Sequence, residues 1–539
     1  MSCGVVCLSA ALILAGGPAA RAAEPPADDA AALALRAATE LRLGHYADAE
    51  TAWRRVIALR EAERAPTPEL AAALEGLGEV LRRRGRFDDA EAVLARALAL
   101  EERTFGPESR SAVPSLTALG TMARSRGRYE EAEWLYRRAL ALEEKAPAPR
   151  TVKVGGLLGN LADLCRAQGR PAEAEDLSRR ALALLEPILP ADHPDIARAL
   201  DTLGRNLIDR GLLDEGEALL RRARAIDEKT LGPEHPEGVV VLSDLADLEL
   251  RRQRAPEAVK LYERVLSIRE RALGENHPDV ATALNNLAVG LVAAGRSAQA
   301  EPLYRRALAI GERALGPDDS SLAATLDNLA SLDHDAGEDD EAEALLRRSI
   351  GILETAHGSD DVRLATPLQI LGEVYRVQER LEEAAPLFER ALSLLDRTFG
   401  PEHPRLLKTL NGLAAVTQDK GDTARAEALY RRSIGISDAA PDEVWPERAV
   451  GLNNLALLYH TLGRKEEAKQ LLMRALAALE RGAGPHHPSV ARILVNLAAV
   501  CAETGQASYA RSLYRRAADI DATVTEAQIR RVSARPDRP

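Results

Sequence analysis

Apolar residues recur at three- and four-residue spacing along most of the chain, in pairs of stripes separated by a glycine. In residues 274–310 the first stripe is Ala281, Leu284, Leu287, Ala288 and Leu291, and the second is Ala300, Leu303, Tyr304, Ala307 and Leu308. This spacing places the apolar residues on one face of a helix. Two such helices joined by the short turn at Gly295 predict a helix-turn-helix hairpin.

The glycine between the two stripes returns at a fixed interval. The aligned positions are Gly44, Gly85, Gly127, Gly169, Gly211, Gln253, Gly295, Gly337, Glu379, Gly421, Gly463 and Gly505. The first step is 41 residues and each later step is 42, so twelve units fill about residues 30–521. Gly supplies a left-handed helix C-cap at little cost. Gln253 and Glu379 must therefore adopt that conformation or end their helices differently.

A second glycine ends several of the hairpins. It begins the linker Gly-Glu-Asn-His-Pro at residues 274–278, with variants at 232–236, 400–404 and 484–488. The glycine caps one helix, and the last proline suits the first turn of the next. A hairpin of this size cannot bury its own stripes, so neighbouring hairpins must stack and share a core. The pattern predicts an all-α solenoid of about twelve hairpins.

Composition agrees with helices and points away from nucleic acid. Aromatic residues make up 3% of the chain, and the net charge of −12 comes from 83 acidic and 71 basic residues interleaved along it. Such a sequence favours solvated helix surfaces, and we expect no nucleic-acid partner. Cys165 and Cys501 lie too far apart in a stacked array to form a disulfide.

The first residues resemble a secretion signal. Residues 5–15 form an apolar run that is too short to span a bilayer, and Ala20-Arg21-Ala22 fits a cleavage site. We therefore expect a signal peptide at 1–22, a linker at 23–30, the repeat array at 31–523 and a tail at 524–539. The protein would be exported, to the periplasm or beyond, without stable membrane insertion. No Lys or Arg precedes the run, which leaves open a cytoplasmic protein or one tethered by an uncleaved segment.

The repeat resembles the tetratricopeptide (TPR) family, in the 42-residue form found in kinesin light chains and many bacterial proteins. The matching positions are Leu287, Ala288, Gly295, Ala300, Tyr304 and Ala307. The resemblance implies a right-handed superhelix whose first helices line a concave, ligand-binding surface. Two departures stand out: the linker replaces the proline that ends the ordinary 34-residue unit, and no heptad coiled coil precedes the array. A kinesin-type role is therefore not implied.

Asparagine recurs at one position of the first helix. In steps of 42 residues the column reads Asn160, Thr202, Asp244, Asn286, Asn328, Ile370, Gly412, Asn454 and Asn496. Asn is unfavourable inside a helix, and its amide can pair with the main chain of an extended peptide. One hypothesis is a peptide-binding groove made by Asn160, Asp244, Asn286, Asn328, Asn454 and Asn496. The other is that these amides only hold the stacking in register.

Charged residues flank this column, and they lean acidic. A clamp of Lys, Arg and Asn for a terminal carboxylate is approached only by Asn160 with Arg198 and Arg205. An arginine column lies on the second helices, at residues 55, 96, 138 and onward in steps of 42 to 516. We interpret it as ion pairs with glutamates within and between hairpins, the alternative being a phosphate-binding strip.

Histidine recurs in the linkers, as His193, His235, His277, His403 and His487. Equivalent positions of stacked hairpins are too far apart to share a metal ion, so we expect these residues to cap helix starts. Trp445 takes the histidine position in an irregular linker. Its ring either packs on adjacent helices or anchors a partner.

No enzyme signature is found. The chain has no glycine-rich phosphate loop, HExxH motif or Gly-x-Ser-x-Gly elbow, and we expect no catalytic residue, cofactor or metal. The sequence predicts a non-catalytic scaffold that binds a peptide or partner protein in its groove. The alternatives are a regulatory sensor of a small peptide signal and a structural spacer in an envelope assembly.

Overall fold

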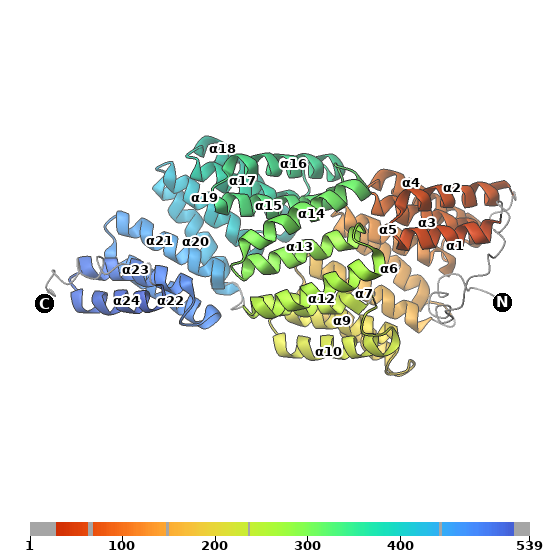
Figure 1. The fold of residues 1–539 in the computed structure, drawn as a ribbon, viewed down its shortest axis with the longest axis horizontal. Coiled ribbons are helices and arrows are strands. Elements are labelled where there is room, and N and C mark those ends of the chain that lie inside the picture. Colours follow the sequence, from red (N-terminus) through yellow and green to blue (C-terminus); the bar gives the residue numbers. More distant parts are fainter. Residues whose placement is uncertain (1–28, 63–67, 147–149, 236–237, 441–444, 522–539) are drawn as a thin grey trace.

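The computed structural model describes residues 29–62, 68–146, 150–235, 238–440 and 445–521. Over these residues it contains 24 α-helices and no strand (Figure 1). The predicted signal peptide, most of the linker after it and the C-terminal tail lie outside the described residues. The expected all-α solenoid of helix-turn-helix hairpins is confirmed.

Each hairpin consists of an odd-numbered and an even-numbered helix, and we number the hairpins 1 to 12 in chain order. The first helices are α1 (Ala30–Arg42), α3 (Pro68–Arg83), α5 (Val113–Ser125), α7 (Thr151–Ala167), α9 (Pro194–Asp209), α11 (Val239–Arg251), α13 (Pro278–Ala293), α15 (Ala323–Ala336), α17 (Ala365–Val377), α19 (Leu407–Asp419), α21 (Trp445–Thr461) and α23 (Pro488–Glu503). The second helices are α2 (Tyr46–Ala62), α4 (Phe87–Phe105), α6 (Tyr129–Glu144), α8 (Pro171–Leu185), α10 (Leu213–Thr230), α12 (Ala255–Leu273), α14 (Ser297–Leu315), α16 (Asp339–His357), α18 (Leu381–Phe399), α20 (Thr423–Ala439), α22 (Lys465–Ala483) and α24 (Ala507–Ile520). Short 3₁₀ turns that lie wholly within the described residues precede four first helices: η1 (Arg110–Ala112), η3 (Ser320–Leu322), η4 (Val362–Leu364) and η5 (Pro404–Leu406).

The turn between the two helices of each hairpin is left-handed. Every glycine of the predicted column has a positive φ, from 65° at Gly85 to 87° at Gly421. Gln253 and Glu379 adopt the same conformation, with φ of 59° and 60°. These two residues therefore accept the strain of the left-handed region, and the turn is preserved without glycine.

The core lies between the two helices of a hairpin and continues into the next. Ala300 and Ala307 are buried and allow α13 and α14 to approach, while Tyr304 fills the space between them. One apolar cluster joins Tyr262 of hairpin 6, Tyr304 of hairpin 7 and Leu329 of hairpin 8. Stacking of neighbours therefore provides the core that no single hairpin could form.

The first helices form the inner layer of the coil. Where helices of successive hairpins contact each other across an intervening helix, the pairs are first helices, such as α3 with α5, α7 with α9 and α19 with α21. Closer approach on one side curves the stack toward that side. The residues of the asparagine column therefore face a concave surface.

Arginine holds successive hairpins together on the outer layer. Arg138 reaches Glu102 at 2.6 Å, and Arg306 reaches Glu270 at 2.8 Å. The same link from one second helix to the preceding hairpin recurs in Arg96–Glu61, Arg180–Glu144, Arg222–Glu186, Arg264–Glu228, Arg348–Glu312, Arg390–Glu354, Arg432–Asp396, Arg474–Asp438 and Arg516–Glu480. Each ion pair contributes little to stability alone. Together, the ion pairs favour one stacking register and neutralise the charge of the arginine column. These contacts support the ion-pair interpretation over a phosphate-binding surface.

The coil returns onto itself. Figure 1 shows α1–α4 beside α13–α16, although 172 residues of sequence separate the end of α4 from the start of α13. His277, which precedes α13, forms a hydrogen bond with the carbonyl of Arg42 in α1. The helices α21–α24 extend away from this body at the opposite end (Figure 1).

Candidate functional site

All six predicted groove residues lie on first helices and are partly exposed. Asn160 is on α7, Asp244 on α11, Asn286 on α13, Asn328 on α15, Asn454 on α21 and Asn496 on α23. The column thus lines the inner layer as expected. Its members differ, however, in what their side chains contact.

Four of the asparagines belong to networks between hairpins. The amide of Asn328 on α15 donates to Asn285 on α13 at 3.1 Å, and Asn285 donates to Asn286 at 3.3 Å. Asn285 was not among the predicted residues, although the Asn-Asn pair in the sequence marks it. One amide therefore bridges two members of the column and ties hairpin 7 to hairpin 8.

The same network is repeated in hairpins 11 and 12. Asn496 donates to Asn453 at 2.8 Å, and Asn453 donates to Asn454 at 3.2 Å. These contacts favour a role in register for Asn286, Asn328, Asn454 and Asn496. Their use by a ligand stays a prediction.

The break in the column has a packing cause. The ring of Phe388 on α18 lies between Gly372 and Gly412, and a Cβ on Gly372 would come within 2.7 Å of it. Any larger residue at either position would displace the ring. A hollow of about 380 Å³ opens beside Phe388 and Gly412, between α17, α19 and α21.

A second hollow, of about 410 Å³, lies on the inner layer of hairpins 4 to 6. Gly155, Gly156 and Gly159 of α7 line it next to Asn160. A Cβ on Gly155 would press on Leu185, but Cβ atoms on Gly156 and Gly159 would meet no atom within 4 Å. Glycine inside a helix costs about 1 kcal/mol relative to alanine. Packing against described residues explains only the first of these three glycines.

The amide of Asn160 differs from those of the two networks. Within the described part of the chain it makes no hydrogen bond. The residue before it is Gly159 rather than asparagine, and the next hairpin carries Thr202 in the column. Both partners that the other amides use are therefore missing, and the Asn160 amide is available at the edge of the hollow.

The floor of this hollow is rich in carboxylates. Arg205 of α9 lies 3.3 Å from Asp163 and 3.3 Å from Asp201, and 3.9 Å from Asp244. Asp201 is 7% exposed, and one of its carboxylate oxygens has no hydrogen-bond partner among the described residues. Burial, followed by the negative charge of Asp201, raises the pKa of Asp244 well above its usual range. Arg205 is thus shared by three carboxyl groups, of which Asp163 also lies 4.0 Å from Arg166.

The carboxylate clamp considered from the sequence is not formed. Arg198 pairs with Asp195 on its own helix, and Arg205 is occupied by its aspartates. Neither guanidinium is left to receive a terminal carboxylate. The hollow instead suits a cationic or hydrogen-bond-donating group.

The linker histidines cap helix starts. The Nδ1 atoms of His193, His277, His403 and His487 accept the backbone N–H two residues later, at 3.0–3.2 Å. Ser109, Asp319 and Asp361 do the same in other linkers. The capping interpretation of these four histidines is therefore supported.

Trp445 packs on the second helix of its own hairpin and on the residue that begins the next hairpin. Its indole lies edge-on to His487, with ring centroids 6.1 Å apart, and it covers Gly482 so closely that a Cβ there would collide with it. These contacts support the packing interpretation. Its role as a partner anchor stays a prediction.

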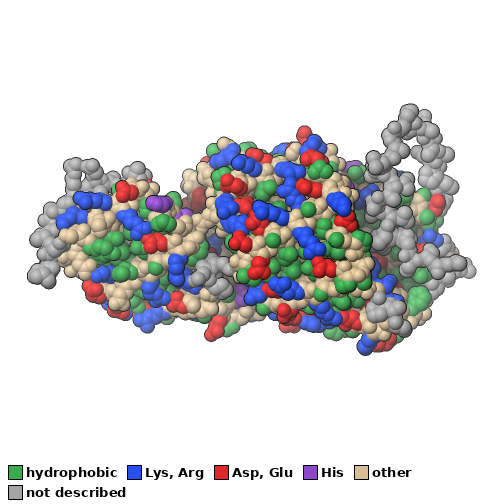
Figure 2. All heavy atoms as spheres, turned by 90° about the horizontal axis from the view of Figure 1, so that it is seen from below, with side chains coloured by type: hydrophobic (Ala, Val, Ile, Leu, Met, Phe, Trp, Pro, Cys, Tyr) green, Lys and Arg blue, Asp and Glu red, His purple; other side chains and the backbone are tan. Residues whose placement is uncertain are grey.

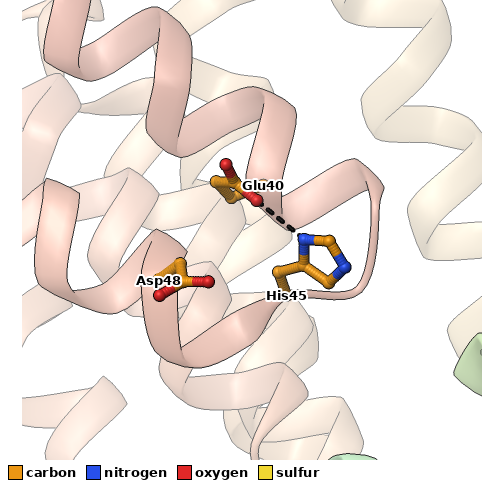
Figure 3. A group of neighbouring side chains, drawn as sticks. All are labelled: Glu40, His45 and Asp48. Carbon is orange, nitrogen blue, oxygen red and sulfur yellow. Dashed lines mark hydrogen bonds and ion pairs between the residues drawn. The ribbon is translucent and has the colours of Figure 1, made fainter.

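Only one group of potential metal ligands comes together among the described residues. Glu40, His45 and Asp48 bring three ligand atoms within 4.8 Å of one another at the first turn. Figure 3 shows His45 Nδ1 paired with Glu40, at 2.8 Å. This hydrogen bond accounts for the approach of Glu40 and His45. His45 and Asp48 are exposed, and we assign no metal there.

Cysteine chemistry and membrane insertion find no support in the described structure. Cys165 and Cys501 are free and buried, and burial raises the pKa of Cys165 to about 11, which keeps this thiol protonated. None of the described helices combines the length and apolarity needed to cross a membrane. Figure 2 shows basic and acidic side chains interspersed over one face of the molecule.

Comparison with known proteins identifies the repeat. A family model described as tetratricopeptide repeat matches residues 28–99, 69–145, 154–211, 204–270, 239–312, 279–355, 363–439 and 447–523. The crystal structure of BtubC (BKLC) from P. vanneervenii is similar at 21% identity and a TM-score of 0.36, covering 42% of this chain and 91% of that one. A kinesin light chain of Podosopora anserina with nearly identical TPR-like repeats is similar at 26% identity and a TM-score of 0.33, covering 38% and 97%. No curated protein matches the chain. Because the family model matches most of its length, the chain belongs to the tetratricopeptide repeat family.

Proposed function

We propose that this protein is a non-catalytic scaffold that binds a peptide segment of a partner in the hollow of hairpins 4 to 6. Tetratricopeptide repeats form protein-interaction scaffolds and are a non-catalytic family. The concave surface is the place where such a scaffold can contact an extended segment along several hairpins.

The observation that carries the proposal is the open backbone of α7. Gly156 and Gly159 weaken the helix, and no described residue packs where their side chains would lie. Glycine without a packing neighbour is typical of a helix that another backbone approaches closely. In this proposal, the main chain of the bound peptide is the backbone that approaches α7 at Gly156 and Gly159.

The chemistry of the hollow defines the ligand further. The Asn160 amide can donate to and accept from the main chain of an extended peptide. A Lys or Arg side chain of that peptide would enter the hollow, whose lining contains four aspartates, Asp163, Asp195, Asp201 and Asp227, and two arginines, Arg198 and Arg205. Because the groove is formed in advance, the entropy cost of binding falls mainly on the ligand.

Two other functions make different predictions. A sensor that tightens around a small peptide would become more compact on binding, whereas the proposed scaffold keeps its shape. A structural spacer would not need the open backbone at Gly156 and Gly159. We also propose export, for which N-terminal sequencing of the mature protein is the test: a new N-terminus after Ala22 supports it, and an intact Met1 contradicts it.

Selection of peptides from a random displayed library on the protein tests the function. We expect peptides with Lys or Arg, and we expect Gly156→Leu/Gly159→Leu to weaken their binding at least tenfold by filling the hollow. Gly351→Leu/Gly435→Leu is the matched control, because these helix glycines also have no neighbour within 4 Å but lie on second helices. Equal binding to both double variants would place the ligand elsewhere.

A further inference from the structure

Four contacts of one kind join two successive turns of the coil. The glycine turns of hairpins 1 to 4 meet the residues that begin hairpins 7 to 10, in the pairs Gly44–His277, Gly85–Asp319, Gly127–Asp361 and Gly169–His403. We call this set of contacts the clasp. The two members of each pair are six hairpins apart, so one turn of the coil contains about six hairpins.

The clasp is tight enough to require glycine. A Cβ on Gly44 would lie 2.9 Å from His277 Nε2, and a Cβ on Gly85 would lie 2.7 Å from Asp319 Oδ2. Such distances are below ordinary van der Waals contact. The same glycines that supply the left-handed turns thus also admit the opposing side chains.

Hydrogen bonds across the clasp use the ends of helices. His277 Nε2 lies 3.3 Å from the carbonyl of Arg42, and Arg363 donates to the carbonyl of Ser125 at 2.7 Å. These carbonyls belong to the last turns of α1 and α5, where no partner within the helix is available. The opposing turn of the coil satisfies them.

Apolar contacts accompany the polar ones. Leu315 at the end of α14 packs on the cluster of Tyr46, Ala49 and Val80 in hairpins 1 and 2. The ring of His357 at the end of α16 lies 5.1 Å from that of Phe87. The clasp is therefore a continuous interface within the chain.

Its histidines fit only as neutral rings. The Nδ1 atoms of His277 and His403 accept backbone N–H groups at 3.0 Å and 3.1 Å, so a proton on Nδ1 would face another donor. Their Nε2 atoms point at the opposite turn. Both nitrogens of His357 are buried without a hydrogen-bond partner among the described residues. Among the described residues, a second proton on these rings finds no acceptor at hydrogen-bond distance, since the Asp279 carboxylate lies 3.9 Å from His277 Nδ1.

We propose that the clasp opens when the pH falls, because protonation of His277, His357 and His403 cannot be accommodated between the two turns. Opening separates hairpins 1–4 from hairpins 7–10. The concave surfaces of those hairpins, which line the inside of the coil, then become reachable from the side. The inference concerns the ligand-free chain and does not depend on the proposed peptide function.

The charges around His277 are mixed. Asp279 favours the protonated ring, whereas Arg269 and His45 oppose it, and burial is the largest effect. The pKa of His277 is lowered as a result. The hydrogen bond to Arg42 also favours protonation but does not reverse this direction.

The pKa values of the other two histidines, His357 and His403, are also lowered. Burial lowers the pKa of His357 to about 4, with Arg363 and Arg126 opposing protonation and Asp361 favouring it. Burial and Arg405 lower the pKa of His403, against a hydrogen bond with the backbone of Gly169. Asp361 offsets part of the effect at His357 without reversing its direction, and no carboxylate contributes at His403.

The sign of the pH effect follows from these shifts. The closed clasp binds protons more weakly than the open one, whose histidines titrate near 6.5. The closed form is therefore fully favoured above pH 6.5 and loses stability as the pH falls from 6.5 toward 4. Allowing for solvent screening of the partly exposed rings, we expect the open-to-closed ratio to rise about tenfold or more between pH 7.5 and pH 5.

Distance measurement by pulsed electron paramagnetic resonance tests the clasp. Spin labels on Ala47→Cys and Glu275→Cys, both exposed, report on the first contact, with Cys3 and Cys7 replaced by serine. We expect a short distance at pH 7.5 and a reversible shift to longer distances at pH 5, with helicity unchanged. An unchanged distance at pH 5 overturns the proposal.

A variant that cannot titrate sharpens the test. His277→Asn/His357→Met/His403→Asn should stay closed at pH 5, since asparagine can cap a helix and matches the size of Asp319 and Asp361 in the other two contacts. The control His193→Asn/His487→Asn changes the same capping position outside the clasp and should open like the original protein. If the control also stays closed, the exchange of histidine for asparagine at capping positions in general explains the effect, and the proposal fails. Should the triple variant not fold, X-ray scattering of the original protein decides, because an equal radius of gyration at pH 7.5 and pH 5 excludes opening.

Discussion

Asparagine occupies the same position of the first helix in hairpin 4 and in hairpin 7, yet the two side chains have different surroundings. Asn286 accepts from Asn285, which in turn accepts from Asn328 of the next hairpin. Asn160 follows a glycine, and Thr202 stands in place of the next asparagine. The identity of two neighbours, one adjacent in sequence and one 42 residues later, decides whether the amide joins hairpins or faces an open hollow.

A column of identical residues in a repeat protein therefore does not define one role. The networks at Asn285 and Asn453 are the same arrangement in two places, and both consume hydrogen-bonding capacity that a ligand would need. The hollow beside Asn160 has an amide without a hydrogen-bond partner among the described residues and space that no described side chain fills. We base the proposed function on the second combination.

The largest expected effect is on the charge balance of the hollow. Arg205→Met removes the guanidinium that lies within 3.9 Å of Asp163, Asp201 and Asp244. The loss should lower the free energy of unfolding by about 3–5 kcal/mol at pH 7.5. Urea unfolding followed by circular dichroism measures it.

The control for this prediction is Arg198→Met on the rim. Its side chain is 65% exposed and pairs only with Asp195, so we expect a change within about 0.5 kcal/mol. Equal losses for the two variants would mean that Arg205 does not balance a buried cluster.

The next effect concerns the amide networks. Asn285→Ala leaves Asn286 and Asn328 without their shared partner and should cost about 2 kcal/mol of unfolding free energy. Asn453→Ala should cost about the same in thermal or urea unfolding, because the second network is a copy of the first. A neutral result for both would refute the role of these amides in register.

A smaller effect is expected from Asp244→Asn. The folded chain holds a proton on Asp244 more tightly than the unfolded chain does, so the stability of the original protein falls as the pH rises above the ordinary aspartate range. The amide removes this loss and should stabilise the fold by about 1 kcal/mol at pH 8, with little change at pH 4. Unfolding at the two pH values measures how the free energy of unfolding changes with pH. If this change is the same in the variant and in the original protein, Asp244 is not the group that causes it.

The sequence predicted the parts of the fold that depend on local pattern. The 42-residue period located every turn, including those at Gln253 and Glu379, because a left-handed cap is required wherever the chain reverses. The role of His193 as a helix cap also followed from its place before Pro194. These features need only residues that are close together in the chain.

Features that depend on the angle between hairpins could not be predicted. The bond from Asn328 to Asn285 requires the exact offset of two helices, and the sandwich of Phe388 between Gly372 and Gly412 requires their separation. The contact of His277 with Gly44 accumulates small rotations over six hairpins. The 42-residue period does not determine the total rotation over six hairpins, so the clasp could be identified only from the structure.

The most direct test of the account compares Asn160→Ala with Asn286→Ala, using one selected peptide for both. Titration calorimetry should show Asn160→Ala weakening the peptide about tenfold while urea unfolding changes by less than about 0.5 kcal/mol. Asn286→Ala should do the reverse, losing stability and keeping the peptide affinity. If Asn160→Ala binds the peptide as tightly as the original protein, or Asn286→Ala loses it equally, the hollow of hairpins 4 to 6 is not the binding site.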